Sequence, residues 1–239
     1  MRKHILIMTS FVVVISAGLV AVLLNVGFTP VEASAESHQI DRLLLRLLVV
    51  AAVIFTLCLV AIIYSCVVFR RRRDEGDEDG EDGPTWQSHA PTEIIWTLVP
   101  LVIVIIFAVY GAVVLKDITQ APPGDKELEV NVTAFQWAWS FEYPQYNITS
   151  SEIRLPVNRP VLFHLQSRDV IHAIWVPEFR VKQDAVPGMM MMLRVTPDRV
   201  GDYKMYCNQL CGLGHSYMTA PVKVVEPAAF DQWVKEQRK

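Results

Sequence analysis

The sequence lacks a surplus of basic charge and internal repeats, and it has only four cysteines. The 22 Lys and Arg face 25 Asp and Glu, for a formal net charge of −3, so the basic footprint of a nucleic-acid-binding protein is absent. No repeated period indicates a repeat architecture. Cys58 and Cys66 lie inside an apolar run, where cysteine behaves as a small apolar residue. Only Cys207 and Cys211 need another explanation.

Apolar residues are abundant instead, at 52% of 239 residues. Three long apolar runs cover residues 5–28, 43–69 and 94–115. Each is long enough to cross a hydrocarbon core of roughly 30 Å as a helix. Helix is the expected structure because the backbone in lipid must hydrogen-bond to itself.

Basic residues predict the orientation of these spans. Arg70 to Arg73 end the second run, so that end is predicted to be cytoplasmic and residues after about 117 to lie outside. Residues 70–84 read as a solvated cytoplasmic loop with four basic and then seven acidic residues. The first run is either a retained helix or a signal peptide ending near Ala33 to Ala35, and both alternatives give the same final orientation.

From residue 126 the pattern changes to short runs punctuated by Pro, Gly, Asn and Asp. Polar and apolar residues alternate in "ELEVNVTAF", as in a half-buried strand. The predicted fold class is therefore a membrane-anchored all-β protein with an antiparallel β-sandwich or barrel. Residues 227–239 read as a short terminal helix. The predicted divisions are 1–39 (first apolar run and outer linker), 40–124 (helix pair with acidic loop) and 125–239 (β domain).

The stretch "YCNQLCGLGHSYM" carries the candidate chemistry. Cys207, Cys211 and His215 are spaced by four, and Met218 follows three residues later. Gly212 and Gly214 make a helix face unfavourable, so a loop after a strand is expected. A disulfide explains the cysteines alone in an oxidising compartment. Zinc would use the cysteines with His215 and the second histidine, His172.

Methionine favours copper over zinc, because thioether, thiolate and imidazole all suit copper. A blue-copper site uses one cysteine, and this loop supplies two. Two thiolates that bridge two ions, each capped by one imidazole, predict a dinuclear centre. Such a centre has no open coordination position, so it favours an electron relay over substrate chemistry.

Three stretches, "CNQLCGLGHSYM", "DVIHAIWVPEFRVKQDAVPG" and "FQWAWSFEYP", closely resemble subunit II of haem–copper oxygen reductases, the cytochrome c oxidase family. The resemblance implies a cupredoxin-like domain with a dinuclear CuA copper centre. It implies that Cys207 and Cys211 bridge the ions, that His172 and His215 cap them, and that Met218 is a weak ligand. The backbone carbonyl of Gln209 would be the last ligand.

The sequence departs from the family at two positions. Many members have Glu where this chain has Gln209, and that carboxylate also holds magnesium at the interface with subunit I, so the magnesium site is in doubt. Ala138 separates Trp137 and Trp139 where members often have Tyr. By position, Trp137 resembles the residue that receives the electron, and Trp139 is expected to pack.

The remaining candidate residues have structural roles as alternatives to functional ones. Glu93, in "PTEIIWTLVP", resembles the acid near the cytoplasmic mouth of the family's K-channel for protons, but a carboxylate also favours any helix N-terminus. Asp169 is expected to orient the region of His172 by hydrogen bonding. His164 is expected to be packed or at the surface, and Met189 to Met192 are expected to pack in the core and at an interface.

The resemblance implies a function. A cytochrome c or another haem donor would dock outside a bacterial plasma membrane. Electrons would reach haem in subunit I, which reduces oxygen to water and translocates protons. This chain itself carries no plausible oxygen site. The alternatives are the copper subunit of a nitric oxide reductase and a non-redox anchored module with zinc or a disulfide.

Overall fold

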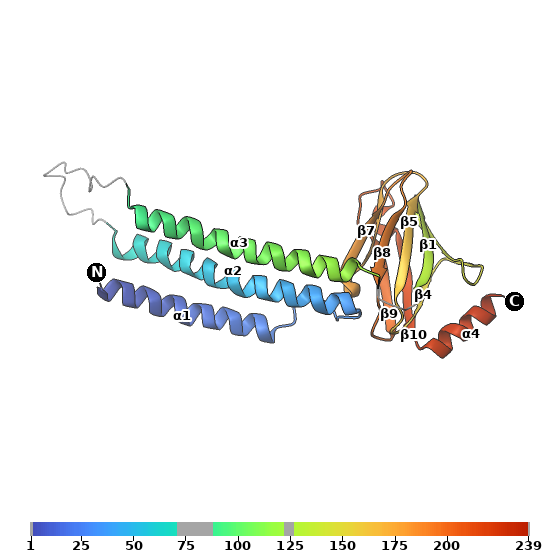
Figure 1. Cartoon of the computed structure of the whole chain (residues 1–239), viewed down its shortest axis with the longest axis horizontal. Helices are drawn as coiled ribbons and strands as arrows, with labels where there is room; N and C mark the ends of the chain where they lie inside the picture. Colours follow the sequence, from blue (N-terminus) through green and yellow to red (C-terminus); the bar gives the residue numbers. More distant parts are fainter. Residues whose placement is uncertain (1, 71–87, 122–126, 239) are drawn as a thin grey trace. The chain divides into compact units, whose positions relative to one another are not determined.

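The computed structural model describes residues 2–70, 88–121 and 127–238 and contains two compact units (Figure 1). The first unit comprises Met1–Phe28 and Leu43–Ala112, and the second comprises Thr29–Arg42 and Val113–Lys239. The loop predicted at residues 70–84 lies outside the described residues, apart from Arg70.

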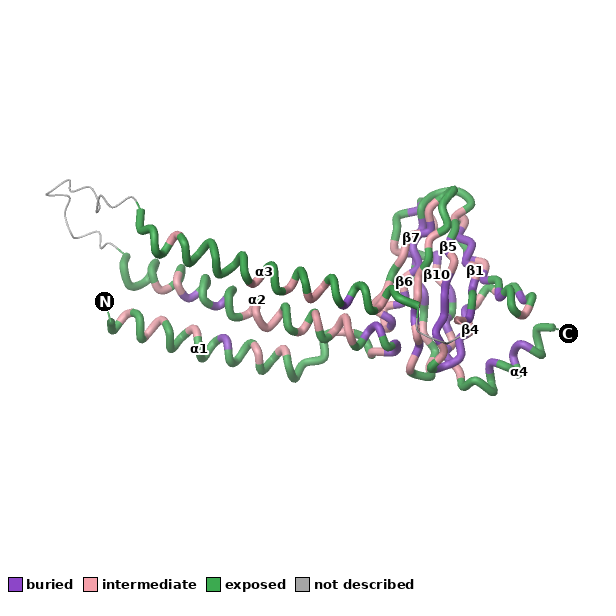
Figure 2. The backbone as a smooth tube through the Cα atoms, in the orientation of Figure 1, coloured by how far each residue is buried: buried purple, intermediate pink, exposed green. Residues whose placement is uncertain are grey.

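Three helices within the described residues are long and apolar enough to cross a membrane. They are α1 (Arg2–Asn25), α2 (Ala35–Val68) and α3 (Ala90–Thr119). His4 of α1 contacts Tyr64 of α2, with 2.7 Å between Nδ1 and the hydroxyl oxygen. Most apolar side chains of these helices are exposed (Figure 2), so they need lipid or partner protein around them.

The second unit is a sandwich of two five-stranded sheets. One sheet has the order β3-β2-β1-β5-β8, and the other has the order β4-β10-β9-β6-β7. The strands of the first sheet are β1 (Leu128–Phe135), β2 (Ala138–Tyr143), β3 (Ile148–Ser150), β5 (Val161–Ser167) and β8 (Met191–Val195). Those of the second are β4 (Ile153–Pro156), β6 (His172–Val176), β7 (Val181–Ala185), β9 (Gly201–Cys207) and β10 (Thr219–Val225).

Alternation of apolar residues builds the core between the sheets. In β1, Leu128, Val130 and Val132 are fully buried, whereas Glu129 between them is exposed. Side chains of a strand point alternately to opposite faces, so one face of β1 packs inward and the other meets solvent. Figure 2 shows the buried positions gathered along the strands of this unit. The predicted sandwich is confirmed.

Each sheet also contains one parallel pair, which the antiparallel prediction did not include. β1 pairs in parallel with β5, and β4 pairs in parallel with β10. These pairs arise because the chain changes sheet between β3 and β4 and returns at β5. Strands that are distant in sequence thereby become neighbours.

Residues 29–42 form a strap that packs on the β domain as part of the same unit. Ala33 donates its backbone N–H to the Glu178 carbonyl at 3.0 Å, and the Asp198 N–H donates to the Ala33 carbonyl at 3.2 Å. Asp41 accepts two hydrogen bonds from the Arg180 guanidinium, at 2.8 and 2.9 Å. The strap therefore completes the hydrogen bonding of this edge of the domain.

The predicted terminal helix is confirmed as α4 (Pro227–Gln237). Pro227 occupies its first turn, where the missing N–H costs nothing. Phe230, Trp233 and Val234 are buried, and the Trp233 ring lies 5.2 Å from the Tyr143 ring. Helix α4 therefore covers apolar surface of the domain.

Candidate metal centre

Sheet register brings the first two candidate ligands together. Strands β6 and β9 are antiparallel neighbours, with Ile174 paired to Cys207. His172 begins β6 and Cys207 ends β9. The Asn208 N–H donates to the Ala173 carbonyl at 3.0 Å, which continues the pairing one residue beyond the strand. The backbone ladder thus fixes His172 and Cys207 side by side.

The loop after β9 supplies the other candidates. Gly212 has φ +115, a conformation that favours glycine, and the His215 N–H donates to its carbonyl at 3.1 Å. A short 3₁₀ helix, η2 (His215–Tyr217), follows. The Cys207 N–H then donates to the Met218 carbonyl at 3.0 Å. The loop after the strand, which the sequence predicted, therefore folds back on the strand from which it started.

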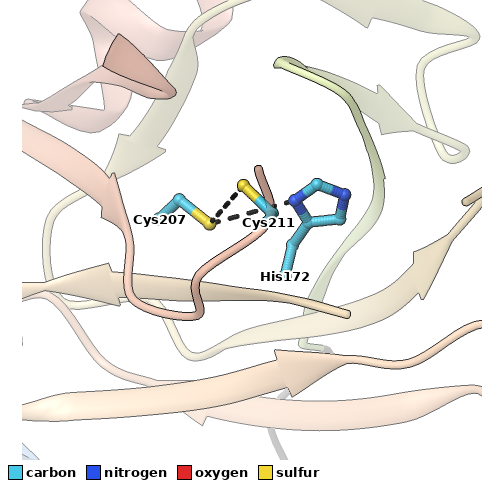
Figure 3. A group of neighbouring side chains, drawn as sticks. All are labelled: His172, Cys207 and Cys211. Carbon is cyan, nitrogen blue, oxygen red and sulfur yellow. Dashed lines mark hydrogen bonds between the residues drawn. The ribbon is translucent and has the colours of Figure 1, made fainter. Parts of the chain in front are cut away.

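The nitrogen and sulfur atoms of four side chains form a row. The Cys207 sulfur lies 3.9 Å from His172 Nδ1 and 3.8 Å from the Cys211 sulfur (Figure 3). The Cys211 sulfur lies 3.6 Å from His215 Nδ1. All of these contacts involve atoms that can bind a soft metal. The row has a histidine at each end and the two cysteines in the middle.

Two further atoms reach the sulfurs. The Met218 sulfur lies 3.7 Å from the Cys211 sulfur, and Met218 is fully buried. The Gln209 carbonyl oxygen lies 3.3 Å from the Cys207 sulfur, whereas the Gln209 side chain is exposed. The structure thus brings together all six residues that the sequence nominated: His172, Cys207, Gln209, Cys211, His215 and Met218.

The cysteines are not joined. Both are free, and 3.8 Å between their sulfurs is far longer than the roughly 2.05 Å of a disulfide. Burial, together with hydrogen bonding to Cys207, raises the pKa of the Cys211 thiol to about 11. A metal ion that binds the Cys211 sulfur must therefore displace the thiol proton.

Three of these ligand atoms are also mutually close. Among the described residues, ligand atoms of His172, Cys207 and Cys211 all lie within 4.8 Å of one another. His215 contacts the sulfur of Cys211, whereas His172 contacts the sulfur of Cys207.

Asp169 fixes the ring of His172. Its carboxylate lies 2.8 Å from Nε2, which leaves Nδ1 facing Cys207. Although desolvation acts in the opposite direction, hydrogen bonds from His172 and from the backbone N–H groups of Gln136 and Val170 hold the pKa of Asp169 at about 2. Asp169 is therefore ionised at neutral pH and orients His172, as predicted.

Trp137 lies directly on the metal-binding loop. Its indole N–H donates to the Cys211 carbonyl at 3.2 Å, and 43% of the residue is exposed. A Cβ at Gly214 would lie 2.5 Å from two ring carbons of Trp137, so only glycine allows this approach. Trp137 thus joins a surface position to a ligand residue through one hydrogen bond.

Trp139 is buried and packs as predicted, with its ring 6.0 Å from the His172 ring. Gln136 was missed by the sequence analysis. Its side-chain amide donates to the Cys211 carbonyl at 2.8 Å, alongside Trp137. No motif marks a glutamine of this kind, because its role depends on a loop that is distant in sequence.

Glu93 belongs to the other compact unit, in the first turn of α3. Its carboxylate accepts the His89 backbone N–H at 2.8 Å. This contact satisfies a free donor at the start of the helix. It accounts for a carboxylate at this position without reference to proton transfer.

Comparisons with known proteins support the resemblance. The family described as "Cytochrome C oxidase subunit II, transmembrane domain" matches residues 21–114, and the family described as "Cytochrome C oxidase subunit II, periplasmic domain" matches residues 148–225. The match to the periplasmic domain, together with the three apolar helices, confirms that the protein is anchored in a bacterial membrane. Its β domain lies on the outer side.

Full-length relatives are similar over most of the chain. Cytochrome c oxidase subunit 2 of Synechocystis sp. is 31% identical over 88% of this chain and 76% of that protein. The protein of that name from Cereibacter sphaeroides is 31% identical over 89% of this chain and 80% of that protein. Quinol oxidase subunit 2 of Bacillus subtilis is 26% identical over 89% of this chain and 66% of that protein.

Proposed function

Because this chain belongs to the cytochrome c oxidase subunit II family, we propose that it receives electrons at a dinuclear copper centre for a haem–copper oxidase. The observation that carries this proposal is the row of two histidines and two unjoined cysteines. A row with one imidazole at each end has room for two ions that share the sulfurs.

Cys207 and Cys211 would bridge the ions, and His172 and His215 would cap them. Met218 and the Gln209 carbonyl would be weak additional ligands. The donor set fits copper because it consists of soft sulfur, imidazole and one main-chain oxygen. Two copper ions that share both thiolates would supply a one-electron couple whose geometry changes little between its two states.

Trp137 would carry the electron from the docked donor to this loop. Its exposed ring is available to a partner, and its N–H bond to the Cys211 carbonyl supplies a short connection to a ligand residue. The donor would be cytochrome c or another haem protein. A relative named as a quinol oxidase subunit makes a quinol the alternative donor.

The partner would be subunit I, which would hold the haem that reduces oxygen, together with the other oxidase subunits. The exposed apolar faces of α1, α2 and α3 fit burial against such a subunit and lipid. Glu93 would serve at a proton-uptake mouth. The magnesium site stays in doubt, because the exposed Gln209 side chain offers an amide in place of a carboxylate.

Metal analysis of the purified complex tests the proposal. We expect two copper ions per copy of this chain and a purple mixed-valence absorption that disappears on reduction. One zinc ion per chain, or no metal with a Cys207–Cys211 disulfide, would favour the non-redox anchored module instead.

A nitric oxide reductase is the second candidate, because the terminal acceptor would bind in another subunit. Turnover of the same complex with oxygen and with nitric oxide separates the two. We expect oxygen consumption driven by reduced cytochrome c. Faster reduction of nitric oxide than of oxygen would assign the chain to the other enzyme.

A further inference from the structure

A second group of soft metal ligands lies outside the candidate metal centre, on the outer face of β5 and β8. It begins in the run Met189 to Met192. Met189, Met190 and Met192 are each 57% exposed, whereas Met191 packs against the core. Met191 therefore packs in the core as expected, and Met189, Met190 and Met192 lie on the surface of the chain. Methionine is usually buried, so three solvent-facing thioethers need a reason.

The sheet register places a histidine beside one of them. β5 and β8 are antiparallel, with His164 directly opposite Met192. The flanking residues Phe163 and Leu165 are buried, so His164 and Met192 share the outer face. Directly opposed residues on one face have Cβ atoms roughly 4.5–5.5 Å apart, which is within reach of one bound ion.

Met190 extends the pair. It precedes β8 by one residue and lies two positions from Met192, the spacing at which side chains of an extended chain share a face. Met189 is an odd number of positions from both Met190 and Met192, so it does not share their face of an extended chain. The outer face thus offers one imidazole and two thioethers, here called the His164 site: His164, Met190 and Met192.

The His164 imidazole also has a carboxylate near one of its ring nitrogens. His164 Nε2 lies 3.9 Å from a Glu129 carboxylate oxygen, on the neighbouring strand β1. A carboxylate beside one ring nitrogen leaves the other nitrogen free to bind a metal, as is common for histidine ligands. Asp169 lies closer to His172 in the candidate metal centre, at 2.8 Å from Nε2, within hydrogen-bond distance.

We propose that the His164 site binds Cu(I). One imidazole and two thioethers are neutral, soft ligands, and thioether favours Cu(I) over zinc, magnesium or calcium. No electron or proton has to move when Cu(I) binds a neutral histidine. This binding goes beyond the proposed function and does not depend on it.

Cu(I) titration of the full chain tests the binding. Competition with a chromophoric Cu(I) chelator is measured on a cysteine-free chain, in which Cys58, Cys66, Cys207 and Cys211 are replaced by Ser. Met192→Leu and His164→Gln should each weaken Cu(I) binding by about tenfold or more, the scale seen when metal-supporting groups are lost. Met189→Leu is the matched control, because Met189 is equally exposed and does not share the face of Met190 and Met192.

Equal Cu(I) affinity in the Met192→Leu chain and the cysteine-free parent would overturn the site. So would an equal loss in the Met189→Leu control. Circular dichroism of each variant verifies that the sandwich is folded.

Discussion

The strand-borne and loop-borne halves of the metal centre are built differently. His172 is fully buried in a strand, with Asp169 on its second ring nitrogen, and Cys207 ends the neighbouring strand. Cys211 and His215 sit in a loop, and His215 is only partly buried. The first half is positioned by sheet hydrogen bonds, and the second by turns and by contacts with Trp137.

This difference indicates that the two halves contribute differently to metal affinity and to electron exchange with a donor. The strand-borne half is pre-organised, because changing it would break the β6–β9 ladder. The loop-borne half is where Trp137 meets the centre, since its indole and the Gln136 amide both bind the Cys211 carbonyl. Metal affinity should therefore depend most on the strand side, and exchange with a donor on the loop side.

The largest effect is expected when either of the two cysteines that connect the halves is replaced. Cys207→Ser or Cys211→Ser should abolish the dinuclear absorption, because a hydroxyl cannot replace a thiolate that bridges two soft ions. Optical and electron paramagnetic resonance spectra of the purified complex measure it. Cys58→Ser, in α2, is the control and should leave both spectra unchanged. A serine variant with a normal dinuclear spectrum would contradict the bridging role.

The second-largest effect is expected from a change in the strand-borne half. Asp169→Asn removes the ionised partner of His172 and should weaken copper binding by about 10–100-fold, the range for partners of metal ligands. Chelator competition measures the affinity. Asp202→Asn is the control, because Asp202 is an exposed residue of β9, the strand of Cys207. Equal affinities in both variants would show that Asp169 does not support the ligand.

The loop-borne half is tested through its aromatic contact. Trp137→Phe should leave the copper spectrum intact and slow oxidation of reduced cytochrome c, because the N–H bond to the Cys211 carbonyl is lost. Stopped-flow absorbance measures the rate. Trp175→Phe, on β6, is the control. A donor rate equal to that of the unaltered complex would remove Trp137 from the route.

Gly214→Ala sharpens the same test without changing the tryptophan. The new methyl group would lie 2.5 Å from the Trp137 ring, so the indole must move. We expect slower donor oxidation with copper retained. Leu213→Ala changes the neighbouring residue, which is 96% exposed, and should have a smaller effect. The reverse order of the two rates would argue against close packing of Trp137 on the loop.

Met218→Leu should have the smallest effect. Leucine has a similar volume, so the buried site should stay packed and retain copper. Loss of the thioether 3.7 Å from the Cys211 sulfur should shift the reduction potential of the centre. Redox titration followed by absorbance measures the shift. Loss of copper from this variant would mean that Met218 is a principal ligand.

The sequence predicted the features that depend on local pattern. Alternation located strand β1, and glycine in the Cys211–His215 segment predicted a loop in place of a helix. Strand β7 (Val181–Ala185) was missed, because "VKQDA" carries little apolar signal and lies at a sheet edge. Residues 29–39 of the strap were expected only as a linker, since Ala33 and Ser34 are too small to mark burial.

The candidate ligands were predicted from their spacing and from the family resemblance, but their supports were harder to find. Asp169 was expected because it lies three residues before its partner His172. Gln136 lies 75 residues before Cys211, and only the fold brings its amide to that carbonyl. The pairing of His164 with Met192 was unreadable for the same reason, because it depends on the β5–β8 register.

The most direct test of the account is the electron paramagnetic resonance spectrum of the oxidised, purified complex, recorded with its copper content. The account predicts two copper ions per chain and a hyperfine pattern from one unpaired electron shared equally by two copper nuclei. A pattern from a single copper nucleus, or the absence of any copper signal from a site that contains zinc, would contradict it.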